Sequence, residues 1–144
     1  MLKLVEKLDA SMEHESCLEL PFEDRQRARL KTILDDGREV GLFLPRGDIL
    51  RGGDLLRGED GTIVKITAAA EAVSTARCAD AFQLSRACYH LGNRHVALQI
   101  GDGWLRYLED HVLDDMVIGL GLEIAHEQAP FEPESGAYSA HHPH

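Results

Sequence analysis

The sequence predicts an α+β protein, with a β-rich amino-terminal domain followed by a ferredoxin-like (βαββαβ) carboxy-terminal domain. The first half of the 144-residue chain alternates β-prone stretches with glycine-containing turns. The second half holds two stretches with apolar residues at helical spacing, each flanked by β-prone stretches. The order of these elements is that of a split βαβ fold. We place the domains at residues 1–71 and 72–135, with a flexible tail over 136–144.

The first half carries a strong hairpin signal. Residues 27–45, RARLKTILDDGREVGLFLP, are β-prone on both sides of Asp36-Gly37, and an Asp-Gly pair favours a tight turn between two strands. Residues 45–62 are dense in glycine, which fits short strands and turns. They lack the spacing of a P-loop, so we interpret these glycines as turn residues and not as a phosphate cradle.

A strand at residues 73–78 is expected to lead into the first helix. Asp80 can cap this helix, with Gln83 as the reciprocal partner of a capping box. Gly92 is expected at the C′ position, where a helix commonly ends in the left-handed conformation. The apolar face of the helix is predicted to comprise Ala81, Leu84, Cys88 and Leu91.

The remaining elements are a hairpin, a second helix and a last strand. Gly101-Asp102-Gly103 separates two β-prone stretches and predicts the hairpin turn. The second helix is expected to begin near Asp110 and to end at Gly119 and Gly121, before a strand over 122–128. Its buried stripe is predicted to comprise Val112, Leu113, Met116, Val117 and Leu120.

The chain is acidic, with a formal net charge of −10. We therefore expect neither nucleic acid nor an anionic membrane surface as a partner, whereas metal cations and basic protein surfaces are attracted. The sequence shows no amino-terminal signal and no apolar run long enough to cross a bilayer. Cys17, Cys78 and Cys88 form no CxxC pair, so we interpret them as small buried side chains and expect a cytoplasmic protein.

Three of the eight histidines carry an ordinary structural interpretation. His14 lies in a polar stretch and is expected to be solvated. His90 lies on a helix face that points mainly to water. His126 shares a strand face with apolar residues and is expected to pack at the rim of a core.

His95 differs because it follows the predicted end of the first helix, on a turn. Loop residues on a rigid base often carry function, although a lone histidine there is more often a surface residue. One imidazole makes a poor metal site, since zinc takes about four ligands and nickel four to six. Near a two-fold axis, however, His95 of each protomer would contribute to one shared ion.

His111 begins the second helix and shares a face with Asp115, four residues on. That carboxylate can orient the imidazole as a metal ligand, and a simple surface ion pair is the alternative. The tail holds a further tract, His141, His142 and His144, which cannot pack a core but binds borderline metals. A purification-tag remnant is the alternative for the tract, and Pro143 within the tract argues against it.

These residues resemble the UreE family, the nickel metallochaperones that assist urease activation. The similar stretches are LPRGDILRGGD at 44–54, CYHLGNRHVALQI at 88–100, DHVLDDM at 110–116 and PFEPESGAY at 130–138. The resemblance implies a homodimer in which His95 of each subunit binds an interfacial nickel ion. It also implies that the tail histidines His141, His142 and His144 add ligands.

The resemblance implies partners as well. These are the urease apoprotein, the urease accessory GTPase and the other urease accessory proteins. By the same analogy the domain at residues 1–71 is similar to the peptide-binding domain of Hsp40-type chaperones and binds partner segments.

The chain departs from some relatives at the second predicted helix. Where those relatives carry an HxH pair, this chain has Glu109-Asp110-His111, so only the second histidine is present and Glu109 offers an oxygen ligand. The tail is also shorter than in long-tailed relatives, which favours a carrier over a storage protein.

The resulting hypothesis is a non-enzymatic carrier that binds Ni(II) as cargo and delivers it to urease. An N/O ligand set also accepts Zn(II) or Cu(II) in vitro. The alternative is a general nickel- or zinc-binding or scaffold protein of the assembly complex with no delivery role. An enzyme is disfavoured because no HExxH and no nucleophile motif is present.

Overall fold

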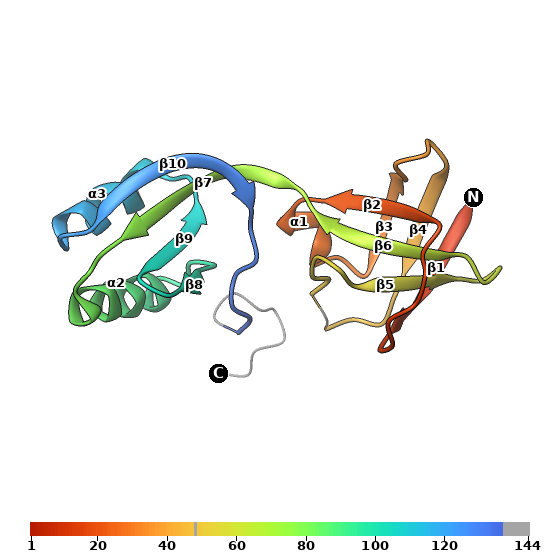
Figure 1. Ribbon diagram of the computed structural model, residues 1–144, viewed down its shortest axis with the longest axis horizontal. Coiled ribbons are helices and arrows are strands. Elements are labelled where there is room, and N and C mark those ends of the chain that lie inside the picture. The colour runs from red at the N-terminus through yellow and green to blue at the C-terminus, as the bar shows by residue number, and fades with distance from the viewer. Residues whose placement is uncertain (48, 137–144) are drawn as a thin grey trace. The chain divides into compact units, whose positions relative to one another are not determined.

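The computed structural model describes residues 1–47 and 49–136, and the chain divides into two compact units (Figure 1). One unit is Met1–Ala69 and the other begins at Ala70. The first is dominated by strands, and the second combines strands with two longer helices. The predicted α+β class, with a β-rich half followed by a βαββαβ half, is confirmed.

The first unit is built around a six-stranded mixed sheet of order β2-β6-β5-β1-β4-β3. Strand β1 runs parallel to β4 and β2 runs parallel to β6, while the other neighbours are antiparallel. Its core consists mainly of leucine with valine and isoleucine from alternate positions along the strands. The elements are β1 (Leu2–Leu8), β2 (Ser16–Leu20), α1 (Phe22–Arg25), β3 (Arg29–Ile33), β4 (Glu39–Phe43), β5 (Leu55–Gly58) and β6 (Ile63–Ala68).

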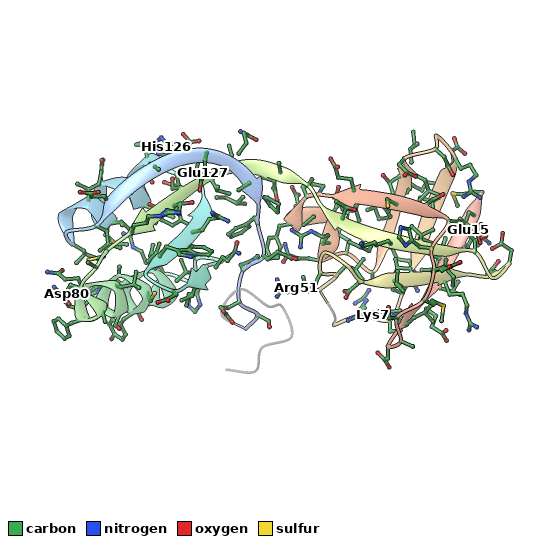
Figure 2. All side chains as sticks on the ribbon, viewed as in Figure 1. Lys7, Glu15, Arg51, Asp80, His126 and Glu127 are labelled. Atoms are coloured by element: carbon green, nitrogen blue, oxygen red, sulfur yellow. The ribbon has the colours of Figure 1, made fainter. Side chains whose placement is uncertain are left out.

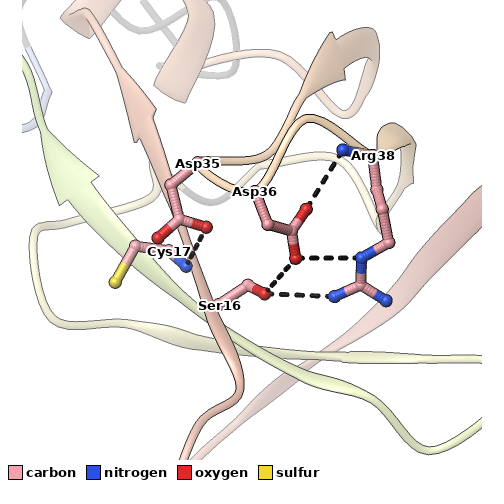
Figure 3. Close-up of polar contacts among 5 residues, drawn as sticks. All are labelled: Ser16, Cys17, Asp35, Asp36 and Arg38. Atoms are coloured by element: carbon pink, nitrogen blue, oxygen red, sulfur yellow. Dashed lines mark hydrogen bonds and ion pairs between the residues drawn. The ribbon is translucent and has the colours of Figure 1, made fainter.

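The predicted Asp-Gly hairpin joins β3 to β4, and polar contacts hold its turn (Figure 3). Gly37 has φ 88°, the left-handed conformation that makes glycine favourable there. Asp36 Oδ2 accepts hydrogen bonds from Ser16 Oγ at 2.8 Å and from Arg38 Nε at 3.0 Å. A hydrogen bond from the backbone N–H of Arg38 to Asp36 Oδ1, together with these two bonds, lowers the pKa of Asp36. The turn is therefore fastened to strand β2, which lies at the other end of the strand order from β3.

The second unit has the predicted β-α-β-β-α-β order, and its antiparallel sheet has the strand order β10-β7-β9-β8. Strands β7 and β10 pair over eight residues, from the pair formed by Ala70 and Pro130 to the pair formed by Arg77 and Glu123. Both helices contribute to one core with the sheet, through Ala87, Leu91 and Val117. The elements are β7 (Ala70–Arg77), α2 (Ala81–Asn93), β8 (Gln99–Gly101), β9 (Trp104–Leu108), α3 (His111–Gly119) and β10 (Glu123–Pro130).

Both helices begin at the predicted aspartates. Asp80 accepts a hydrogen bond from the backbone N–H of Phe82, and Asp110 accepts from those of Val112 and Leu113. Each aspartate thereby satisfies amide groups that have no partner within the helix.

The predicted apolar faces need two corrections. Ala81 and Val112 are exposed, because each lies in the first turn, before its helix reaches the core. Ala87 is fully buried in α2, and the polar residue Asp114 is buried in α3. A buried carboxylate in an amphipathic helix requires polar partners, and these are described below.

The chain after β10 lies along the start of β8. Phe131 is fully buried, the N–H of Glu132 donates to Gln99 Oε1, and the N–H of Glu134 donates to the carbonyl of Leu98 at 2.8 Å. The segment after the last strand is therefore docked as far as residue 134.

The three cysteines carry free, partly buried thiols, and burial raises the pKa of Cys88. Among the described residues, no helix has the length and apolar character needed to cross a bilayer.

Candidate metal site

His95 follows α2 in a left-handed backbone conformation, with φ 59°. Its N–H donates to the carbonyl of Gly92 at 2.9 Å, and the N–H of Val96 donates to the carbonyl of Leu91 at 3.2 Å. These two bonds form a Schellman motif in which His95 is the C′ residue. The prediction that Gly92 takes this position is wrong, because α2 continues through Asn93 and the left-handed residue comes later.

Helix α3 ends in the same motif with glycine in the equivalent place. Gly121 has φ 94°, its N–H donates to the carbonyl of Ile118, and the N–H of Leu122 donates to that of Val117. Within residues 1–47 and 49–136, His95 is the only non-glycine residue with positive φ. For a residue with a Cβ this conformation costs roughly 1–2 kcal/mol. Such strain concentrates at functional positions, so His95 is the first candidate for a functional residue in this unit.

The left-handed turn leaves His95 at the surface, while residues on both sides of it in the chain are buried. His95 itself is exposed, whereas Leu91 just before it and Leu98 just after it are buried. The N–H of Glu134 donates to the carbonyl of Leu98, so the chain that leads to the last histidines is held at a residue three positions after His95, just before β8. The predicted tail ligands His141, His142 and His144 lie outside the described residues.

His111 is the first residue of α3 and is exposed. The expected partnership with Asp115 is not found: within the described part of the chain no hydrogen bond or ion pair joins the two side chains. In that same part, no three His, Cys, Asp or Glu side chains are grouped so that they could hold a metal ion. His111 therefore remains a candidate ligand on position and residue type alone.

A polar cluster that the sequence did not reveal lies on α3 and the strands beside it. In the sheet register Ser74 is opposite both Tyr107 and His126, so the three residues form one row across β9, β7 and β10. Asp114 spans this row: its Oδ1 accepts from Tyr107 Oη at 2.6 Å, and its Oδ2 is 2.7 Å from His126 Nε2. Figure 2 shows His126 on β10.

The second ring nitrogen of His126 points toward another carboxylate. His126 Nδ1 is 3.7 Å from Glu109 Oε1, and the two side chains are 51% and 45% exposed. The expectation that His126 packs at the rim of a core is corrected, because the ring is half exposed and is held between carboxylates.

The cluster shifts the pKa values of its members. Burial alone would raise the pKa of Asp114, but hydrogen bonds from Tyr107 and His126 outweigh burial and lower it. Burial and the bond to Asp114 raise the pKa of Tyr107 well above its usual range. The bond to Asp114, with a smaller contribution from Glu109, raises the pKa of His126. The cluster therefore favours an ionised Asp114 beneath a half-exposed imidazole.

Family comparisons agree with the division of the fold. The model of the UreE urease accessory protein N-terminal domain matches residues 2–69, and that of the C-terminal domain matches residues 71–144. The chain therefore belongs to the UreE family of urease accessory proteins.

Individual relatives cover most of the chain. It is 62% identical over 138 residues to the urease accessory protein UreE of Alkalilimnicola ehrlichii, covering 96% of this chain and 85% of the relative. It is 61% identical over 127 residues to a Pseudomonas putida UreE, covering 87% and 77% respectively. The Citrobacter koseri protein is 53% identical over 150 residues, covering 100% and 99%.

Proposed function

We propose that this urease accessory protein is a cytoplasmic nickel metallochaperone, which binds Ni(II) between two protomers through His95 and delivers it to the urease apoprotein. The observation that carries the proposal is that a histidine, His95, takes the C′ position of α2 with φ 59°, whereas α3 has Gly121 at the equivalent position. A strained residue is retained where the surrounding structure holds it and function requires it. An exposed imidazole suits a borderline cation such as nickel.

The surface of α2 supports a dimer on this side of the unit. Phe82 and Tyr89 lie seven residues apart on α2 and are 70% and 69% exposed. Large exposed aromatic side chains on one helix are typical of a surface that another protein covers. Association about a two-fold axis near His95 would bring two imidazoles to one ion, since every residue at an axis meets its own copy.

The docked segment after β10 supports tail participation. From Glu134, bonded to Leu98, to His141 there are seven residues, a stretch that spans at most about 25 Å. His141, His142 and His144 thus have the chain length to approach His95 and complete the ligand set. Glu109 and His111, at the start of α3, are the candidates for a further, weaker site.

Family membership supports the proposed partners. An accessory protein of urease acts with urease, and we assign this chain contacts with the apoprotein, the accessory GTPase and the other accessory proteins. The β-rich unit, Met1–Ala69, is the proposed partner-binding part because it contains no histidine other than His14. No catalytic role is proposed.

The test is a nickel titration followed by calorimetry, with the mass in solution checked by light scattering. Wild type is expected to bind a tight ion at half an equivalent per chain, and His95→Ala is expected to lose that ion while remaining dimeric. His90→Ala is the matched control, because His90 lies on α2, the helix that His95 follows, and its ring packs against Tyr89. Equal nickel affinity in wild type and His95→Ala would overturn the proposal.

Two further measurements separate delivery from scaffolding and nickel from other ions. Urease activation in the presence of accessory proteins should fall in His95→Ala while complex assembly is retained. Activation that is indifferent to His95 would favour a scaffold that binds nickel or zinc incidentally. Parallel titrations with Zn(II) and Cu(II) establish the order of affinities at the same site.

A further inference from the structure

Glu109 and His126 present two metal-binding atoms to the same space. Glu109 follows β9 and His126 lies in β10, so the pair depends on the fold and not on sequence proximity. Their nearest atoms, Oε1 and Nδ1, are 3.7 Å apart. Two ligands of one tetrahedral ion, each about 2.1 Å from the metal, lie about 3.4 Å apart. A shift of a few tenths of an ångström in exposed side chains would place both on one cation.

Asp114 orients the imidazole for this purpose. Metal-bound histidines commonly donate the N–H of the other ring nitrogen to a carboxylate, which fixes the tautomer. Here His126 Nε2 is 2.7 Å from the ionised Asp114, whose side chain is only 9% exposed. With the proton on Nε2, Nδ1 carries a lone pair toward Glu109. Tyr107 holds the other carboxylate oxygen at 2.6 Å, so Asp114 cannot easily turn away.

We infer that Glu109 pairs with His126, and not with His111, to form a second divalent-cation site, with Asp114 as its positioning residue. The two protein ligands leave the remaining coordination positions to water, so the site takes a borderline ion such as Ni(II), Zn(II) or Cu(II) and releases it readily. The site is confined to one chain and requires neither the two-fold axis nor the tail. It therefore stands independently of the function proposed for His95.

The experiment uses the full-length chain carrying His95→Ala, which removes the proposed interfacial ligand. The result at Glu109 and His126 is then independent of the result of the His95 titration. Nickel chloride is added at mildly alkaline pH, and paramagnetic broadening of backbone amide signals is followed by NMR. Broadening centred on Glu109 and His126 is expected, and it should be lost in either Glu109→Gln or His126→Gln. His90→Gln is the matched control and should retain it.

Asp114→Asn tests the positioning role. The amide can donate to Nε2 and move the ring proton to Nδ1, so the nickel affinity at this site should fall about 10–100-fold. Thermal unfolding of the same sample shows whether the fold survives. Because Asp114 is buried, the exposed Glu109→Gln variant carries the decision if Asp114→Asn unfolds.

Two results would overturn the inference. Absence of broadening at His126 under excess nickel would mean that Glu109 and His126 form only an ion pair. Broadening that His111→Gln abolishes and His126→Gln retains would assign the ion to Glu109 and His111. A fall in affinity on Glu109→Gln with unchanged unfolding would support a ligand role, because a purely structural ion pair does not change nickel binding.

Discussion

The left-handed backbone at His95 makes a stability prediction that can be separated from metal binding. In metal-free protein, His95→Gly should be more stable than His95→Ala. Both variants lack the imidazole, so any contact of that side chain is lost equally. They differ in the cost of placing a Cβ at φ 59°.

The magnitude follows from two opposing effects. A residue with a Cβ pays roughly 1–2 kcal/mol in the left-handed region, and glycine avoids this. Glycine in turn gives the unfolded chain more freedom, which offsets about 0.4–1 kcal/mol. The net difference between the two variants is therefore about 1 kcal/mol in favour of glycine. For a domain of about 60–100 residues, such a difference in the free energy of unfolding shifts Tm by about 4–8 °C.

The assay is urea unfolding of full-length protein followed by the fluorescence of Trp104. This residue is the single tryptophan of the chain and lies in β9, so its signal reports on the second unit. Protein concentration is held fixed, because association contributes to apparent stability. Gly121→Ala is the reciprocal control: it introduces a Cβ at φ 94° and should lower the free energy of unfolding by about 1 kcal/mol. A His95→Ala variant as stable as His95→Gly would refute the strain argument.

Two predictions concern the cluster around Asp114. The stabilisation that wild type has over His126→Gln should be largest between about pH 4 and pH 6.5, the usual pKa values of Asp and His. It is lost as pH rises through the raised pKa of His126, and also as pH falls through the lowered pKa of Asp114. Urea unfolding across the pH range measures this, and a difference that is flat with pH would exclude the pair as its source. Tyr107→Phe should lower the free energy of unfolding by about 1–3 kcal/mol, because it removes a donor from a buried carboxylate. Thermal unfolding checks this, and an unchanged Tm would mean that Asp114 finds another donor.

Local patterns predicted much of the fold. Asp80 and Asp110 were expected to start the helices because a short acceptor before an apolar period satisfies the first amide groups. Asp36-Gly37 was expected to turn between strands for an equally local reason. The C′ position of α2 was missed because glycine is the usual residue there. Which residue takes the left-handed conformation depends on where the helix stops packing on the sheet.

The two candidate sites differ in how much of each could be predicted from the sequence. His95 was singled out by its place after a helix, although its strained conformation is visible only in the structure. The cluster of Tyr107, Asp114 and His126 escaped prediction because it depends on strand register. Ser74 faces both Tyr107 and His126 only when three strands are aligned, and no local spacing contains that information.

The contacts of residues 131–134 with Leu98 and Gln99 fix the point from which the chain continues toward its three last histidines. A ligand that is joined to a site by a short stretch of chain can reach an effective concentration on the order of millimolar at that site. The bond from Glu134 to Leu98 sets that point within three residues of His95. Under the proposed function, capture of an ion by the histidines of this segment would be an intramolecular event, whose yield would not depend on the protein concentration in the cell. The same residues supplied as a separate peptide would have to find His95 by diffusion, and dilution would defeat them.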